Sequence, residues 1–224
     1  VSEGTVYVGS LDGHLYAVDA ETGAKQWAVE TDNLVYSSPA VSGGIVYVGS
    51  GSYLSSKGGH LYAVDAQTGE KQWTFGSRSY HSDFGVVSSP SVSEGIVYVG
   101  STDGYLYAVD VQTGEEKWRF QTSGSGASSA VSGGTVYVSS GYHLVGNGHL
   151  YAVDAETGAE QWAFEADSGG VSSSVMSGGT VYIGSGDGHL YAVDAETGAE
   201  QWAFETGDAV QSSPSVYKGT VYVG

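Results

Sequence analysis

The stretch GHLYAVDAETGAEQWAFE, Gly188 to Glu205, decides the fold, and it recurs letter for letter from Gly148 to Glu165. The segment VYVG or a near copy begins at six places around it: Val6, Val46, Val97, Val136, Val181 and Val221. Successive starts lie 40, 51, 39, 45 and 40 residues apart. The chain is therefore an array of similar units, each about one fifth of its 224 residues.

Within one unit, alternation and turn residues predict four short strands, at Ser37–Val41, Ile45–Gly49, His60–Asp65 and Gln72–Phe75. Both faces of these strands are apolar, so both must be covered, and radial stacking of the sheets covers them without helices. Repeats of about 40 residues with several strands are typical of propeller blades. The sequence predicts an all-β fold: a β-propeller of four-stranded antiparallel blades with five countable repeats, a single domain over residues 1–224.

The two ends of the sequence fall at the same phase of the repeat, since VSEGTVYVG opens it and VYKGTVYVG closes it. The first repeat lacks its innermost strand, and Ser212–Val216 is a spare one. Pairing that spare strand with Thr5–Gly9 would close a ring of five blades. Thr220–Gly224 would then duplicate a strand already present, as in a segment of a larger propeller. Both alternatives stay open.

Acidic residues outnumber basic ones by 25 to 7, which gives a formal net charge of −18. This balance excludes a nucleic-acid partner, which needs a basic stripe. It fits either a halophilic protein working in concentrated salt or an ordinary acidic surface. Cysteine is absent, so thiolate chemistry is excluded. No apolar run is long enough to span a membrane, and the lack of a first methionine suggests a processed or excised chain.

A second pattern, AxDxxTGxxxW, is complete in all five repeats, first as Ala17, Asp19, Thr22, Gly23 and Trp27. It resembles the tryptophan-docking motif of the pyrroloquinoline quinone (PQQ)-like propeller repeat, found in quinoprotein dehydrogenases and in non-enzymatic relatives. The resemblance implies an extracytoplasmic or cell-surface location. A residue present in every repeat serves a need that every repeat shares. We therefore assign a structural docking role to Trp27, Trp73, Trp118, Trp162 and Trp202.

For a PQQ-dependent dehydrogenase the resemblance implies calcium, an arginine beside the quinone, a catalytic aspartate, eight blades and often a disulfide. This chain has five repeats, no cysteine and few cations. We therefore expect no enzyme, no catalytic residue, no cofactor and no metal; PQQ with calcium belongs to the alternative of a quinoprotein fragment. Histidines open four of the third strands, but Tyr105 replaces them in one, which argues against a metal ring.

Repeat-specific chemistry is expected where the repeats disagree, in insertions at 51–59, 76–87 and 141–148. The meander places these connections on one rim, where binding residues usually gather. They carry the candidate partner-binding residues Tyr53, Lys57, Arg78, Tyr80, His81, Asp83, Tyr142 and His143, with Phe84 beside them. Lys57 and Arg78 suit an anionic or carbonyl-bearing group.

These observations predict a non-catalytic scaffold that binds a protein or polymer partner through this rim. Three alternatives stay open: a quinoprotein dehydrogenase fragment, tolerated surface loops with no partner, and a recently amplified or designed repeat with no evolved ligand.

Overall fold

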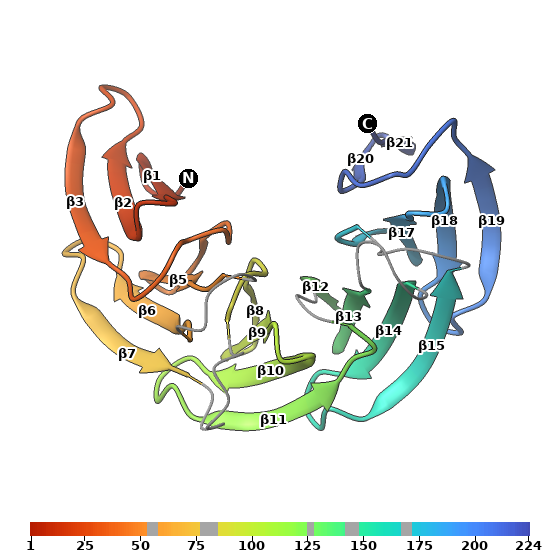
Figure 1. Ribbon diagram of the computed structural model, residues 1–224, viewed down its shortest axis with the longest axis horizontal. Coiled ribbons are helices and arrows are strands. Elements are labelled where there is room, and N and C mark those ends of the chain that lie inside the picture. Colours follow the sequence, from red (N-terminus) through yellow and green to blue (C-terminus); the bar gives the residue numbers. More distant parts are fainter. Residues whose placement is uncertain (53–57, 77–84, 125–127, 142–147, 167–171) are drawn as a thin grey trace. The chain divides into compact units, whose positions relative to one another are not determined.

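The computed structural model describes residues 1–52, 58–76, 85–124, 128–141, 148–166 and 172–224 (Figure 1). The described residues form 21 strands joined by turns. None of the described segments is a helix that could cross a membrane. The chain divides into two compact units, Val1–Arg119 and Phe120–Gly224, with the boundary inside an outer strand. Whether the units form one domain stays a prediction.

We call the sheet of each repeat a blade and number the blades in chain order. Blade one has three strands, β1 (Thr5–Gly9), β2 (His14–Asp19) and β3 (Lys25–Glu30). Blade two has four, β4 (Ala40–Ser42), β5 (Ile45–Gly49), β6 (Leu61–Asp65) and β7 (Lys71–Phe75). Blade three also has four, β8 (Ser91–Ser93), β9 (Ile96–Gly100), β10 (Tyr105–Asp110) and β11 (Glu116–Gln121).

The second unit continues the pattern. Blade four contains β12 (Ser128–Ser132), β13 (Thr135–Ser140), β14 (Gly148–Asp154) and β15 (Glu160–Ala166). Blade five contains β16 (Val175–Ser177), β17 (Thr180–Gly184), β18 (His189–Asp194) and β19 (Glu200–Glu205). A two-stranded sheet follows, β20 (Ser215–Tyr217) with β21 (Thr220–Tyr222). Neighbouring strands of each sheet are consecutive and antiparallel, as the meander requires.

The first strand of blade two starts later than predicted, at Ala40 instead of Ser37, because a side chain replaces the expected backbone pairing. The buried Ser37 hydroxyl accepts a hydrogen bond from Gly49 N at 2.8 Å and donates one to Gly49 O at 2.9 Å. Ser88 bridges to Gly100 in the same way. The first serine of each such pair therefore extends the sheet.

Gly49 is needed for close packing. A Cβ added there would lie 2.2 Å from Cγ1 of Val86, which sits in the segment entering blade three. Gly9 and Gly184 have equivalent close neighbours in Val35 and Val210. This explains why glycine ends the VYVG segments of these blades.

The turn between the third and fourth strands is held by its aspartate. In blade one, Asp19 Oδ1 accepts hydrogen bonds at 2.7 Å from both the amide and the hydroxyl of Thr22. Gly23 follows with a φ of +72°, which favours glycine. Such hydrogen bonds to the ionised form hold the pKa of each turn aspartate below its ordinary value. The turn aspartates are Asp19, Asp65, Asp110, Asp154 and Asp194.

Among the residues that the structure describes, three hydrophobic clusters each join two consecutive blades. Leu15 of blade one packs with Val46 and Tyr62 of blade two. A second cluster joins blades two and three, and a third joins blades four and five. Within each unit, the facing apolar surfaces of consecutive blades therefore cover one another.

Candidate functional site

The predicted rim residues cannot be placed. Tyr53, Lys57, Arg78, Tyr80, His81, Asp83, Phe84, Tyr142 and His143 all lie outside the described residues. Their role in binding stays a prediction. The described residues at the base of these insertions nevertheless show how the two blades with a long second connection differ from the others.

In blades with a short second connection, a tyrosine secures the turn. Tyr16 OH donates to Asp12 Oδ2 at 2.7 Å in blade one. Tyr107 makes the equivalent bond to Asp103 in blade three. The third-strand tyrosine is thus part of an Asp-Gly hairpin turn wherever that turn is short.

Blade two has no such aspartate. Its Tyr62 and His60 instead contact Asp32, in the segment that leads from blade one into blade two. Tyr62 OH accepts a hydrogen bond from Asp32 N at 2.9 Å, and burial raises the pKa of Tyr62 to about 12. His60 Nδ1 lies 2.9 Å from Asp32 Oδ2, which makes an ion pair when His60 is protonated. In blade four, His149 Nδ1 lies 2.8 Å from Ser123 Oγ. These contacts link the third strands of blades two and four to the segments that enter those blades.

Trp27, Trp73 and Trp162 lie between consecutive blades. Trp73 Nε1 donates to Val111 O of blade three at 3.0 Å, and a Cβ added at Gly114 would lie 2.7 Å from Trp73 Cδ2. Trp27 and Trp162 donate to the corresponding carbonyls of the next blade, each at 3.2 Å. Trp118 packs against Tyr98 within its own blade, with ring centroids 5.7 Å apart.

Trp202 is different, because 41% of its surface is exposed. The sheet that follows blade five has only two strands and lacks the third and fourth strands whose turn would receive this indole.

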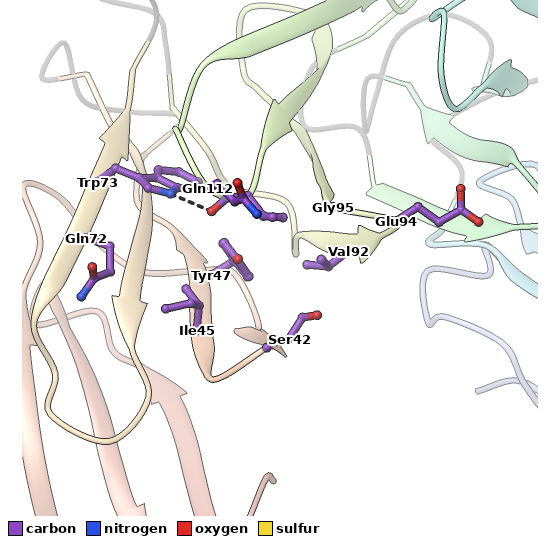
Figure 2. A pocket seen from close by; sticks show the side chains of 11 residues that line it. Ser42, Ile45, Tyr47, Gln72, Trp73, Val92, Glu94, Gly95 and Gln112 are labelled. Atoms are coloured by element: carbon purple, nitrogen blue, oxygen red, sulfur yellow. Dashed lines mark hydrogen bonds between the residues drawn. The ribbon is translucent and has the colours of Figure 1, made fainter.

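A pocket of about 450 Å³ lies between blades two and three, beside Trp73 (Figure 2). Its apolar wall consists of Ile45 and Tyr47 from β5, Val92 from β8, and Val111 after β10, together with Trp73 from β7. Polar side chains surround this wall: Ser42, Gln72, Glu94 and Gln112. The pocket therefore opens among the first and third turns, at the opposite edge of the blades from the predicted insertions.

One tyrosine hydroxyl in this pocket differs from two of its equivalents. Tyr47 is only 2% exposed, and its hydroxyl makes no hydrogen bond with any described residue. In contrast, Tyr7 donates to Ala66 O at 3.0 Å and Tyr137 donates to Ala195 O at 3.2 Å. Burial, and then the negative charge of Asp110, raises the pKa of Tyr47, so its hydroxyl keeps its proton at ordinary pH.

An equivalent pocket of about 690 Å³ lies between blades four and five, entirely within the second unit. Here Thr135 Oγ1 donates to Gln161 Oε1 at 3.1 Å, and Tyr137 is paired as described above. In blade two Ile45 replaces that threonine, and the Gln72 amide has no hydrogen-bond partner among the described residues. Unpaired polar groups therefore distinguish the pocket beside Trp73.

The repeated serines of blades two and three have structural partners. Ser37 and Ser88 use their hydroxyls to bridge strands, so the repeated serines in these blades are not free nucleophiles. Among the residues that the structure places, no three histidine, aspartate or glutamate side chains form a group that could hold a metal ion. The described part of the chain therefore does not fit the calcium ion that accompanies PQQ.

The family described as outer membrane protein assembly factor BamB matches residues 1–146 and 104–224, which together cover the whole chain. Among curated proteins, quinohemoprotein alcohol dehydrogenase ADH-IIG of Pseudomonas putida is 42% identical over 57 residues. That stretch is 23% of this chain and 8% of the dehydrogenase.

Solved structures show the same fold. The structure of ADH-IIG from Pseudomonas putida HK5 matches with a TM-score of 0.62 and 17% identity, over 100% of this chain and 61% of that one. BamB from Moraxella catarrhalis matches with a TM-score of 0.59 and 19% identity, over 98% of this chain and 76% of that one. The chain thus spans less than two thirds of the dehydrogenase structure. These matches confirm the predicted β-propeller fold and PQQ-like repeat.

Proposed function

Because this chain belongs to the PQQ-like repeat family described as outer membrane protein assembly factor BamB, we propose that it is a non-catalytic scaffold. It binds a protein or polymer partner through the rim that carries the insertions. One observation supports this most directly: the repeated polar side chains are engaged in structural bonds. Asp19 holds a turn, Ser37 bridges two strands, and Trp73 bonds the next blade.

The tryptophans dock one blade on the next under this proposal, and what varies between repeats recognises the partner. The family is described as that of an assembly factor, which agrees with a binding role. An extracytoplasmic location is proposed on the same ground. The net charge of −18 further supports a halophilic setting, because concentrated salt screens the repulsion among the acidic side chains. An unfolding temperature that does not rise between low and molar potassium chloride would argue against that setting.

The rim is tested by proximity cross-linking and mass spectrometry with the tagged chain as bait in its native extract. Replacing Arg78, Tyr80 and His81 together by alanine is expected to remove the specific cross-linked partner. The matched control replaces three exposed turn glutamates by glutamine: Glu21, Glu70 and Glu156. Retention of the same cross-links by both triple variants would contradict the proposed rim.

A second candidate is a quinoprotein dehydrogenase fragment, favoured by the 42% identity to the dehydrogenase over 57 residues. Adding PQQ with calcium and following a dye-linked alcohol oxidation separates the two candidates. A bound quinone spectrum with clear turnover would overturn the scaffold proposal. A third candidate, a recently amplified or designed repeat without an evolved ligand, is favoured by the identity of residues 148–165 and 188–205. It predicts no specific cross-linked partner at all.

A further inference from the structure

The pocket beside Trp73 is built from side chains that depart from the repeat. Val111 stands where four other repeats have alanine: Ala20, Ala66, Ala155 and Ala195. Ile45 stands where blades one, four and five have threonine, and Glu94 where blades two, four and five have glycine. All three departures line one pocket. Shared blade architecture therefore does not account for its chemistry.

These departures have a polar consequence. The hydroxyl of Tyr47 and the amide of Gln72 lose the partners that their equivalents have in the pocket between blades four and five. Neither group is engaged in a hydrogen bond with another described residue, so each can pair with a ligand that enters the pocket. The pocket volume of about 450 Å³ lies in the usual range for small-ligand sites.

The charges around the pocket are predominantly negative. Glu94 lies at its edge, with its carboxylate directed away from Tyr47 in Figure 2 and exposed to solvent. Asp110 is close enough to influence Tyr47, although Lys117 Nζ lies 3.2 Å from its Oδ2 and offsets part of its charge. The whole chain carries a net charge of −18, which attracts cations toward any site on its surface.

We propose that this pocket binds an arginine side chain from a basic segment of a protein partner. The aliphatic part of the arginine packs on Ile45 and Val92, and its guanidinium lies against the partly exposed indole of Trp73. Guanidinium N–H groups donate to the Tyr47 hydroxyl and the Gln72 carbonyl oxygen. This site lies at the opposite edge from the insertions and goes beyond the proposed rim.

The test uses two synthetic peptides, acetyl-Gly-Arg-Gly-amide and its citrulline analogue, which keeps the shape of arginine but lacks the charge. Binding is followed by the NMR signal of the Trp73 indole N–H, assigned by its loss in Trp73→Phe. Titration with the arginine peptide is expected to shift this signal, whereas the citrulline peptide leaves it in place. Tyr47→Phe is expected to weaken binding about tenfold, the loss of one hydrogen bond to a charged group.

Tyr137→Phe is the matched control, because it removes the equivalent hydroxyl from the pocket of the second unit, where that hydroxyl is already paired. This variant is expected to bind the peptide as the unaltered chain does. Restoring the repeat with Ile45→Thr and Val111→Ala is expected to abolish binding while the other indole signals stay in place. Equal shifts with both peptides, no shift at millimolar peptide, or full affinity in Tyr47→Phe would each overturn the proposal. The outcome is independent of the cross-linking test of the rim.

Discussion

Two glycines with the same backbone conformation allow the contribution of Trp73 packing to stability to be measured. Gly114 has a φ of +70° and Gly23 a φ of +72°, so alanine at either position adopts the same unfavourable conformation. An added Cβ at Gly114 would lie 2.7–2.9 Å from three atoms of the Trp73 ring. At Gly23 nothing lies within 4 Å of the added atom. The two substitutions therefore differ in one respect: the methyl group of alanine collides with the Trp73 indole at position 114 and meets no atom at position 23.

Alanine in the left-handed region costs about 1–2 kcal/mol, which is the whole expected loss for Gly23→Ala. Gly114→Ala must in addition displace the indole of Trp73. Overpacking of this kind costs about 1–3 kcal/mol, and it strains the 3.0 Å bond from Trp73 Nε1 to Val111 O. We expect Gly114→Ala to lower the free energy of unfolding by about 2–5 kcal/mol in total.

Guanidinium titration followed by far-ultraviolet circular dichroism measures both variants, and equal slopes show that the same surface unfolds. Gly69→Ala repeats the comparison at a second interface, because its added Cβ would lie 2.9 Å from Trp27 Cδ2. Equal losses of stability for Gly23→Ala and Gly114→Ala would refute the view that the indole is tightly seated on this glycine.

Three further predictions follow from local geometry. Ser37→Ala is expected to cost about 1–3 kcal/mol in denaturant titration, because it leaves the buried Gly49 amide and carbonyl unpaired, whereas Ser38→Ala at an exposed position is nearly neutral. Glu94→Gly is expected to increase the free energy of unfolding by up to about 1 kcal/mol and so to raise the melting temperature. Glu94 has a φ of +47°, which costs a non-glycine residue about 1–2 kcal/mol, and the extra flexibility of glycine in the unfolded chain offsets part of that gain. A lower melting temperature would contradict this. The turn aspartates have lowered pKa values, so the stability they contribute is complete above a pH of about 3.8 and is lost as the pH falls through their folded-state pKa values; an acid titration followed by circular dichroism that showed no loss below pH 3.8 would contradict their role.

The parts of the fold that local rules govern were predictable from the sequence. Alternation placed Ile45–Gly49 correctly, and the Asp-Thr-Gly pattern predicted the turn at Asp19 with its hydrogen bonds. The start of the first strand was predicted three residues too early, because propensity does not reveal that the Ser37 hydroxyl replaces a backbone pair. The close approach of Val86 to Gly49 depends on two segments 37 residues apart, and no local pattern contains it.

The pocket beside Trp73 was missed for a similar reason. It is lined by Ile45 from one repeat and Val111 from another, and no pattern within one repeat brings these residues together. A signal was nevertheless present, since Val111 is the one departure from alanine among five aligned repeats. Differences between repeats are obvious in the insertions, where the length changes, whereas single substitutions inside the regular motif do not interrupt its pattern.

The identical letters of β15 and β19 separate the effect of packing from that of side-chain chemistry. Residues 160–165 and 200–205 have the same sequence, but Trp162 is partly buried against blade five, whereas every residue of β19 is exposed. Amide hydrogen exchange in this chain is therefore expected to be faster in β19 than in β15. The protection of an outer strand is thus a property of its neighbour and not of its own six residues.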